Sequence, residues 1–233
     1  MKGRAIFRDR TEAGRKLAEA LERLAWSDPL ILALPRGGVP VAFEVGKALH
    51  APLDVLLVRK IGVPGHSEYG IGAVIDGANP QLVLSEEAMA IVRPDSDYIE
   101  AEKRRQLAEI ERRRKLYLGN RRPVPVAGRT VILVDDGIAT GGTVRAALKA
   151  LRKNQAARIV LAVPVAPRDT LDIIGAADDV ICLATPDPFL AVGVHYEDFE
   201  QTTDSEVIGL LREAEAFGKS QAVRHPRIFT GPS

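Results

Sequence analysis

Short, mainly apolar runs alternate with helical patterns along much of the chain. The runs predict buried strands over residues 29–34, 54–58, 131–134, 158–165 and 179–184. Apolar residues at helical spacing predict helices over residues 11–26, 39–49, 143–154 and 168–176. Strands that alternate with helices are typical of a parallel sheet with helices on both faces. The pattern therefore predicts an α/β fold of three layers around a mostly parallel central sheet.

The segment from about residue 60 to residue 126 interrupts this alternation. Residues 70–75 and 81–84 lie on either side of the turn sequence DGANP and predict a β-hairpin. Residues 95–118 predict one long helix with charged residues on most faces. We interpret this hairpin and helix as an insertion rather than a separate domain.

We expect a single domain over residues 1–233. Its insertion spans about residues 76–127, and its last residues, about 217–233, are expected to be irregular. Neither internal repeats nor low-complexity segments suggest another division of the chain.

Composition removes several classes of protein. Apolar residues make up 46% of the chain, charged residues 27%, and the net charge is +1. The protein thus has no overall electrostatic field that would attract it to nucleic acid or membrane, and any anion site must be local. The single cysteine, Cys182, excludes an internal disulfide framework. The N-terminus has no apolar signal core and no run reaches membrane-spanning length, so we expect a cytoplasmic protein.

The most informative stretch is VILVDDGIATGGTVRAALKAL, residues 131–151. An apolar strand ends in Asp135 and Asp136, a short glycine-containing turn follows, and a helix then begins. Glycines allow the backbone to approach a phosphate closely, and the start of a helix favours negative charge. The hydroxyls of Thr140 and Thr143 add donors. The turn is therefore predicted to be an anion cradle at the carboxyl end of a strand.

The acidic pair argues against a site for phosphate alone, because two carboxylates would repel the anion. A sugar with vicinal hydroxyls, held by carboxylate acceptors, fits better, and a divalent metal would neutralise the excess charge. The sequence GxxxxGK[ST] of a Walker A loop is absent, and the glycines do not form a GxGxxG dinucleotide motif.

This stretch resembles the diphosphoribosyl-binding signature of the type I phosphoribosyltransferases. The resemblance covers about residues 10–65 and 128–212 and implies that family's fold, with a small C-terminal hood. It implies that Asp135 and Asp136 hold the ribose hydroxyls and, through water and substrate, Mg²⁺. The implied contacts of the 5′-phosphate are all in the turn, at Gly137, Ile138, Ala139, Thr140, Gly141, Gly142 and Thr143.

The loop after the first strand, LPRGG, occupies the place where the family binds pyrophosphate. The resemblance implies this role for Arg36, Gly37 and Gly38, and the family often has a cis non-proline peptide here. Taken alone, an ordinary strand-to-helix turn with a solvated arginine is an equally good interpretation.

The second strand ends near Arg59 and Lys60, where the family places basic residues that contact pyrophosphate. The glycine-rich residues 62–72 resemble the family's mobile loop, whose closure would exclude water. His66, Glu68 and Tyr69 lie in this segment. As catalytic residues we favour those placed by strand ends, namely Asp135, Asp136, Lys60 and Arg36.

The segment TPDPFLAVGVHYEDF resembles the hood of purine-type members, where an aromatic ring stacks on the base. Phe189, Leu190, Val192 and Tyr196 are the implied base-binding residues. A hydrophobic cap on the sheet is an equally good interpretation of them. His195 is expected to be a surface or packing residue.

The resemblance implies transfer of 5-phosphoribosyl from 5-phosphoribosyl-1-diphosphate (PRPP) to a nitrogenous base, with release of pyrophosphate. In 6-oxopurine members an aspartate occupies the position of Ala139, and here the loop looks more like the adenine type. A purine-like base is therefore favoured, as in purine salvage, with Glu68 as a candidate acid or base. We expect a homodimer in which the long helix could form the interface.

Two other classes stay open. Pyrimidine attenuation regulators have the same signature and bind RNA, and residues 100–122 carry clustered Arg and Lys. The acids interleaved there favour a solvated helix instead, so RNA binding is not expected. A sugar-phosphate hydrolase or phosphorylase fits the acidic turn less well. An amidotransferase is excluded because no N-terminal cysteine nucleophile is present.

Overall fold

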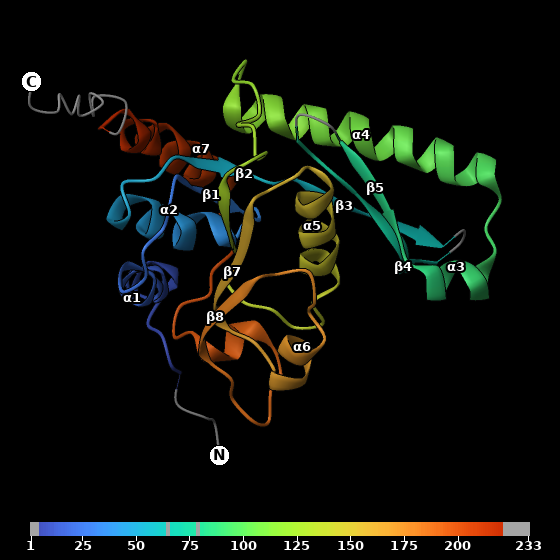
Figure 1. The fold of residues 1–233 in the computed structure, drawn as a ribbon. Helices are drawn as coiled ribbons and strands as arrows, with labels where there is room; N and C mark the ends of the chain where they lie inside the picture. The colour runs from blue at the N-terminus through green and yellow to red at the C-terminus, as the bar shows by residue number, and fades with distance from the viewer. Residues whose placement is uncertain (1–4, 64–65, 78–79, 221–233) are drawn as a thin grey trace, which may run out of the picture.

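The structure, a computed structural model, describes residues 5–63, 66–77 and 80–220. Its central sheet has five strands in the order β2-β1-β6-β7-β8, and all neighbouring strands are parallel (Figure 1). The strands are β1 (Pro29–Ala33), β2 (Leu53–Val55), β6 (Thr130–Val134), β7 (Arg158–Val165) and β8 (Asp179–Ala184). The predicted parallel sheet is confirmed.

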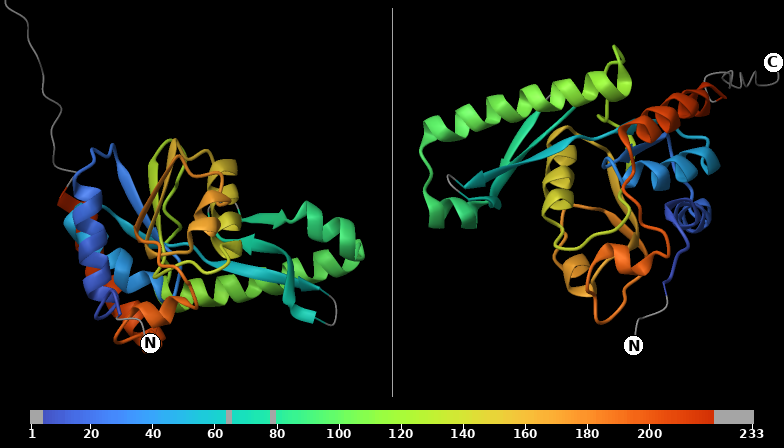
Figure 2. Two further views of the ribbon diagram at one scale, coloured as in Figure 1. Left: turned by 90° about the horizontal axis from the view of Figure 1, so that it is seen from below. Right: turned by 180° about the vertical axis from the view of Figure 1, so that it is seen from behind.

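Helices cover both faces of this sheet, which gives the predicted three layers (Figures 1 and 2). One face carries α1 (Arg10–Glu22), α2 (Gly38–Ala48) and α7 (Asp204–Glu213). The other carries α5 (Gly142–Lys153) and the short helix α6 (Arg168–Asp172). The helix predicted over residues 168–176 thus ends early, and Ala176 has a left-handed φ of 58°.

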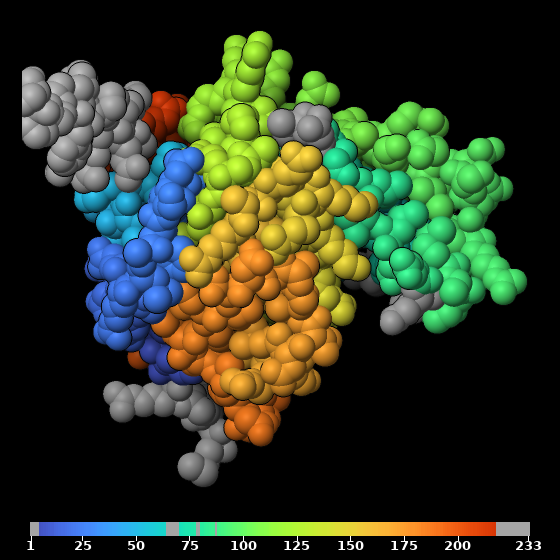
Figure 3. Space-filling view, viewed as in Figure 1, coloured from blue at the N-terminus to red at the C-terminus, as the bar shows by residue number. Residues whose placement is uncertain are grey.

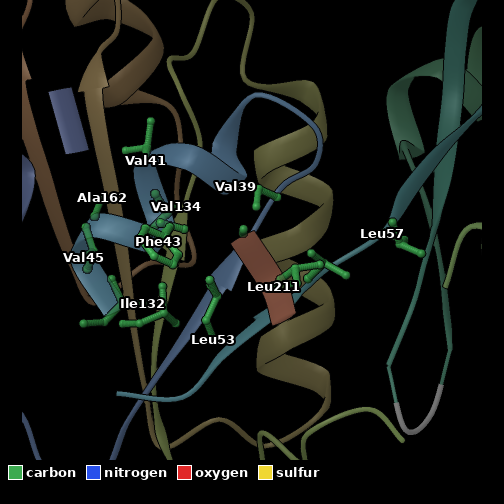
Figure 4. Close-up of a cluster of buried hydrophobic side chains, with 14 of the residues drawn as sticks. Val39, Val41, Phe43, Val45, Leu53, Leu57, Ile132, Val134, Ala162 and Leu211 are labelled. Atoms are coloured by element: carbon green, nitrogen blue, oxygen red, sulfur yellow. The ribbon is translucent and has the colours of Figure 1, made fainter. Parts of the chain in front are cut away.

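Successive side chains of each strand point to opposite faces of the sheet, and both faces are covered, which explains why the strands are apolar throughout. Ile132 and Val134 point into the cluster under α2 and α7, with Phe43 and Leu211 (Figure 4). Their neighbours Val131 and Leu133 point into the cluster under α5. A strand covered on both faces has no polar side, so a short unbroken apolar run is its sequence pattern.

The chain leaves the central sheet after β2 and forms a second, antiparallel sheet (Figure 2). Its strands are β3 (Val58–Val63), β4 (His66–Ile75) and β5 (Gln81–Leu84), followed by α3 (Glu86–Val92) and α4 (Ser96–Leu118). We call residues 58–118 the arm. The run predicted as one strand over residues 54–58 is therefore divided between two sheets. Gly62 pairs with Gly70 and Gly72 with Leu84, so the ends of the segment that resembles the family's mobile loop, residues 62–72, are strands; its closure stays a prediction.

Polar contacts fasten α4 to the rest of the molecule. The Arg114 guanidinium contacts the carboxylates of Asp76, just after β4, and Asp54 on β2, with 3.2 Å to Asp54 Oδ2. The hydroxyl of Tyr98 donates to the carbonyl oxygen of Gly62 at 2.9 Å. The insertion is thus joined to both sheets by partly buried hydrogen bonds.

After β8 the chain passes through η1 (Val192–His195) and α7 and ends its described part in η2 (Ala214–Ser220). None of the helices within the described ranges combines the length and apolarity needed to cross a bilayer.

Candidate functional site

Two loops meet at the carboxyl edge of the central sheet. Because β1 and β6 are neighbouring parallel strands, the loop after β1 lies beside the turn after β6. The backbone N–H of Leu34 donates to the carbonyl oxygen of Val134 at 2.9 Å. A Cβ atom at Gly37 would lie 2.0 Å from Asp136 Oδ2, and one at Gly38 would lie 2.8 Å from the Val134 oxygen. The close contact between the two loops thus requires both glycines.

The loop after β1 has the backbone form that the family resemblance implied. The peptide bond between Pro35 and Arg36 is cis. Helix α2 follows directly, with Gly37 as its N-cap and no side-chain capping bond. The Arg36 side chain is 31% exposed, and its Nη1 atom lies 3.7 Å from Asp204 Oδ1. In the first turn of α2, the N–H groups of Gly38 and Val39 already donate to the carbonyl oxygens of Leu34 and Arg36, and Pro40 has no N–H. The Arg36 guanidinium is therefore the donor of this loop that suits an anion.

Asp136 is held from two sides. Arg10 Nε donates to Asp136 Oδ2 at 2.8 Å, and Arg10 Nη1 donates to the carbonyl oxygen of Glu200 at 2.7 Å. The guanidinium also lies 3.9 Å from the ring centre of Phe199. The hydroxyl of Tyr196 donates to the backbone carbonyl of Asp136 at 2.5 Å. Asp136 therefore has a fixed orientation before any ligand binds.

No local pattern marks Arg10 as a site residue, since it lies at the start of a helix where an exposed charge is ordinary. The N-terminal segment reaches the site because Phe7 pairs with Tyr196 in an isolated β-bridge. Their ring centres are 5.4 Å apart, and the backbone N–H of Phe7 donates to the carbonyl of His195 at 3.0 Å. This packing brings α1 to the acidic turn.

The surroundings of Asp135 disfavour its negative charge. Burial, and then the negative charge of Asp136, raise the pKa of Asp135 well above its usual value. The backbone N–H of Asp136, which donates to Asp135 Oδ1 at 2.9 Å, and the charge of Arg10 act in the opposite direction. A ligand that brings hydrogen-bond donors or a cation would favour the ionised form of Asp135.

The acidic pair fits Mg²⁺ only as part of a larger ligand set. Across the described ranges, no group of three or more His, Cys, Asp or Glu side chains forms a metal site. Asp135 and Asp136 supply carboxylate oxygens, the ligand type that Mg²⁺ prefers, and Mg²⁺ usually keeps water and takes substrate oxygens as well. The donors therefore suit a metal that arrives with its substrate.

The turn after the acidic pair is anchored at its middle and open on both sides. Ile138 is buried, and its backbone N–H donates to the carbonyl oxygen of Val165 at 2.9 Å. Gly141 has a φ of 72° and caps α5 without a side-chain bond. Ala139, Thr140 and Gly142 are exposed, and Thr143 is half-buried. The small residues predicted to hold a phosphate thus surround the free amides at the start of α5.

The hood candidates separate into two pairs. Phe189 and Leu190 line a cavity of about 710 Å³ together with Ala139 and Thr140 of the turn. Val192 instead packs on Gly137, where a Cβ atom would lie 2.5 Å from Val192 Cγ1. Tyr196 is 5% exposed and supports the turn through its hydroxyl. The cavity is thus lined by the first pair, and the second pair packs beneath the turn.

His195 is a packing residue, as expected. Its side chain is buried, and its ring centre lies 5.1 Å from that of Phe189. Within the described part of the chain, its Nε2 atom is buried without a hydrogen-bond partner. Burial lowers the pKa of His195.

The structure does not bring the three predicted pyrophosphate-binding cations together. Arg59 and Lys60 are neighbours on β3, so their side chains point to opposite faces of the arm sheet. Arg59 Nε donates to Gln106 Oε1 of α4 at 2.9 Å. Lys60 lines a groove beside α5 that reaches Gly142 and Thr143 of the turn, whereas Arg36 lies in the loop after β1. The roles of Arg59 and Lys60 stay predictions. The side chains of His66, Glu68 and Tyr69 lie outside the described part of the structure.

Comparison with known proteins agrees with this geometry. A family model described as phosphoribosyl transferase domain matches residues 6–198. The solved structure of TT1426 from Thermus thermophilus is 43% identical in sequence and superimposes with a TM-score of 0.78. The match covers 89% of this chain and 98% of that one.

Two curated relatives come from Mycobacterium tuberculosis and bear the names "Putative phosphoribosyl transferase MT0597" (strain CDC 1551 / Oshkosh) and "Putative phosphoribosyl transferase Rv0571c" (strain ATCC 25618 / H37Rv). Each is 46% identical over 210 residues, which are 90% of this chain and 47% of the relative. The chain thus spans about half the length of these relatives.

Proposed function

Because the chain belongs to the phosphoribosyl transferase domain family, we propose that it transfers 5-phosphoribosyl from PRPP to a nitrogenous base and releases pyrophosphate. The observation that carries the proposal is the contact between Gly37 and the acidic turn, where a Cβ atom would lie 2.0 Å from Asp136 Oδ2. It puts the glycine-rich loop that carries Arg36, two carboxylates and the open start of α5 at one edge of the sheet. These suit, in order, a diphosphate, a diol and a 5′-phosphate.

Each part of the donor has a chemical partner. The turn Gly137–Thr143 offers amides and hydroxyls to the 5′-phosphate, and Asp135 and Asp136 accept hydrogen bonds from the ribose hydroxyls. Arg36 faces the negative charge of the diphosphate. Mg²⁺, held by the acidic pair together with substrate oxygens, would stabilise the charge of the leaving group.

The reaction breaks the bond between ribose C1 and the diphosphate oxygen and forms a bond from C1 to a nitrogen of the base. The diphosphate leaves with the electron pair, and the nitrogen loses a proton. The protein's own contribution is orientation and charge neutralisation at the donor. Arg10 and Tyr196 hold Asp136 through hydrogen bonds, so one side of the ribose site is fixed before substrate binds.

The acceptor base is proposed to bind in the cavity lined by Phe189 and Leu190, which opens onto Ala139 and Thr140 of the turn. The cavity of about 710 Å³ is within the usual range for small-molecule sites. Asp169 and Asp187 also line it and are candidate acceptors for the proton that the base releases. A purine-like base remains our preference, and purine salvage in the cytoplasm the proposed setting.

Two experiments test the proposal. The first measures thermal unfolding with ribose 5-phosphate or PRPP and Mg²⁺. The second measures turnover with purines, pyrimidines and orotate. Ligand should raise the unfolding temperature, because a ligand that binds only the folded state stabilises it. The double variant Asp135→Asn, Asp136→Asn should fold and lose this rise. The control Asp172→Asn changes an exposed carboxylate on α6 and should keep it. If ligand raised the unfolding temperature of the double variant as much as that of wild type, the assignment of Asp135 and Asp136 to the donor site would be refuted.

The RNA-binding alternative has less support. Cations along α4 pair with acids one turn away, namely Lys103 with Glu100, Arg105 with Glu102, and Arg112 and Arg113 with Glu109. Paired cations offer little net charge to a phosphate backbone. RNA affinity with a steep salt dependence, without turnover of any base, would favour the regulator.

A further inference from the structure

A basic groove adjoins the donor site and extends away from it. It is a groove of about 510 Å³ between α5 and the arm sheet, and it borders the turn only at Gly142 and Thr143. Figure 3 shows the gold surface of α5 facing the blue-green surface of the arm across a notch. Three cations line the groove, Lys60 from β3 and Arg145 and Lys149 from α5.

These cations have no counter-charge of their own. Lys60, Arg145 and Lys149 are all exposed, and in the described ranges none of their side chains has a hydrogen bond or an ion pair with another residue. Glu86 is the one acid among the lining residues. Arg145 and Lys149 are also four residues apart on one helix, where like charges repel. Such a cluster is destabilising until an anion enters.

The groove is too long to be part of the 5′-phosphate site. From Gly142 to Lys149 is seven residues of α5, which at 1.5 Å per residue is about 10 Å along the helix axis. One phosphate in the turn cannot contact both ends. Gly70 and Gly72 of β4 also line the groove.

We propose that this groove binds a second, phosphate-bearing small molecule through Lys60, Arg145 and Lys149. The ligand carries two or more negative charges, because three cations face one acid. A small molecule fits better than RNA, since the groove is bounded on both sides and its volume is that of an ordinary ligand site. Its contact with Gly142 and Thr143 places this ligand beside the proposed donor site, so occupancy of one can affect the other.

Calorimetric titration of the full chain with sodium tripolyphosphate tests the site, in metal-free buffer with saturating ribose 5-phosphate. Lys149→Gln should weaken binding about tenfold, the scale of one lost hydrogen bond to a charged group. The matched control is Lys153→Gln, an exposed lysine one turn further along α5 that does not line the groove. It should weaken binding less than about twofold. Arg145→Gln repeats the test at a second cation.

Equal binding by wild type, Lys149→Gln and Lys153→Gln would overturn the proposal. Tighter, Lys149-dependent binding of a short single-stranded RNA would also overturn it in favour of a nucleic-acid contact. The increase in unfolding temperature caused by ribose 5-phosphate and Mg²⁺ is measured on the same variants and should equal that of wild type. If wild type showed no such increase in unfolding temperature, the proposed transferase function would be contradicted, but the test of the groove would remain valid.

Discussion

Arg10 and Asp136 form an ion pair across 126 positions of the chain, with 2.8 Å between Arg10 Nε and Asp136 Oδ2. Their side chains are only 12% and 15% exposed. The pair joins the start of α1 to the acidic turn after β6. It makes the N-terminal helix part of the proposed donor site.

Arg10→Met should lower the free energy of unfolding by about 3 kcal/mol, because it leaves the largely buried Asp136 carboxylate without its partner. It should also reduce stabilisation by ribose 5-phosphate and Mg²⁺. Urea unfolding with and without ligand measures both. Arg10→Lys should restore part of each effect. The exposed pair Arg168–Asp172 is the control, and Arg168→Met should cost less than about 0.5 kcal/mol. A loss as small as the control would show that the pair does not position the site.

Tyr196→Phe removes one hydrogen bond, from the Tyr196 hydroxyl to the carbonyl of Asp136. We expect a loss of about 1 kcal/mol in urea unfolding and weaker binding of ribose 5-phosphate. Tyr98→Phe is the matched control, since it removes a hydroxyl bond of 2.9 Å to Gly62 in the arm. It should cost similar stability without changing ligand affinity. Equal ligand affinity in both variants would contradict a positioning role for Tyr196.

Gly37→Ala would place a methyl group against the Asp136 carboxylate. Moving that carboxylate should cost about 1–3 kcal/mol, as for other overpacked sites, and should abolish binding of ribose 5-phosphate. An opposite change in stability is expected at Gly209, inside α7, where a Cβ atom would meet nothing within 4 Å. Gly209→Ala should stabilise the protein by about 0.5–1 kcal/mol. Chemical unfolding of the two variants side by side checks both signs.

His195 should make stability fall in mild acid. Burial lowers the pKa of His195 in the folded state, so its contribution is present above the ordinary value of 6.5 and is lost as pH falls through the lowered value. His195→Phe, which keeps an aromatic ring beside Phe189, should reduce the decline between about pH 7 and pH 5. The control His50→Asn, at an exposed residue with a φ of 50°, should leave the wild-type decline in place. Identical pH profiles for wild type and His195→Phe would contradict this.

The local parts of the fold could be predicted because local patterns encode them. An apolar run such as residues 131–134 has no polar side, and burial on both faces of a parallel sheet is the arrangement that suits it. The order DDGIATGGT in front of a helical pattern likewise needs no distant partner to predict an anion cradle. The arm was harder to predict, since the run at residues 54–58 does not show where β2 ends and β3 leaves the sheet.

Local patterns thus specify the α/β layers, the acidic pair and the small-residue turn, since hydrophobic period and turn chemistry act over a few residues. Long-range packing establishes that Arg10 and Tyr196 hold Asp136, that Arg59 and Lys60 point apart, and that Lys60 joins Arg145 and Lys149. These relations depend on how distant elements meet. A charged residue at a helix start or on a strand has the same local pattern whether it faces solvent or a site.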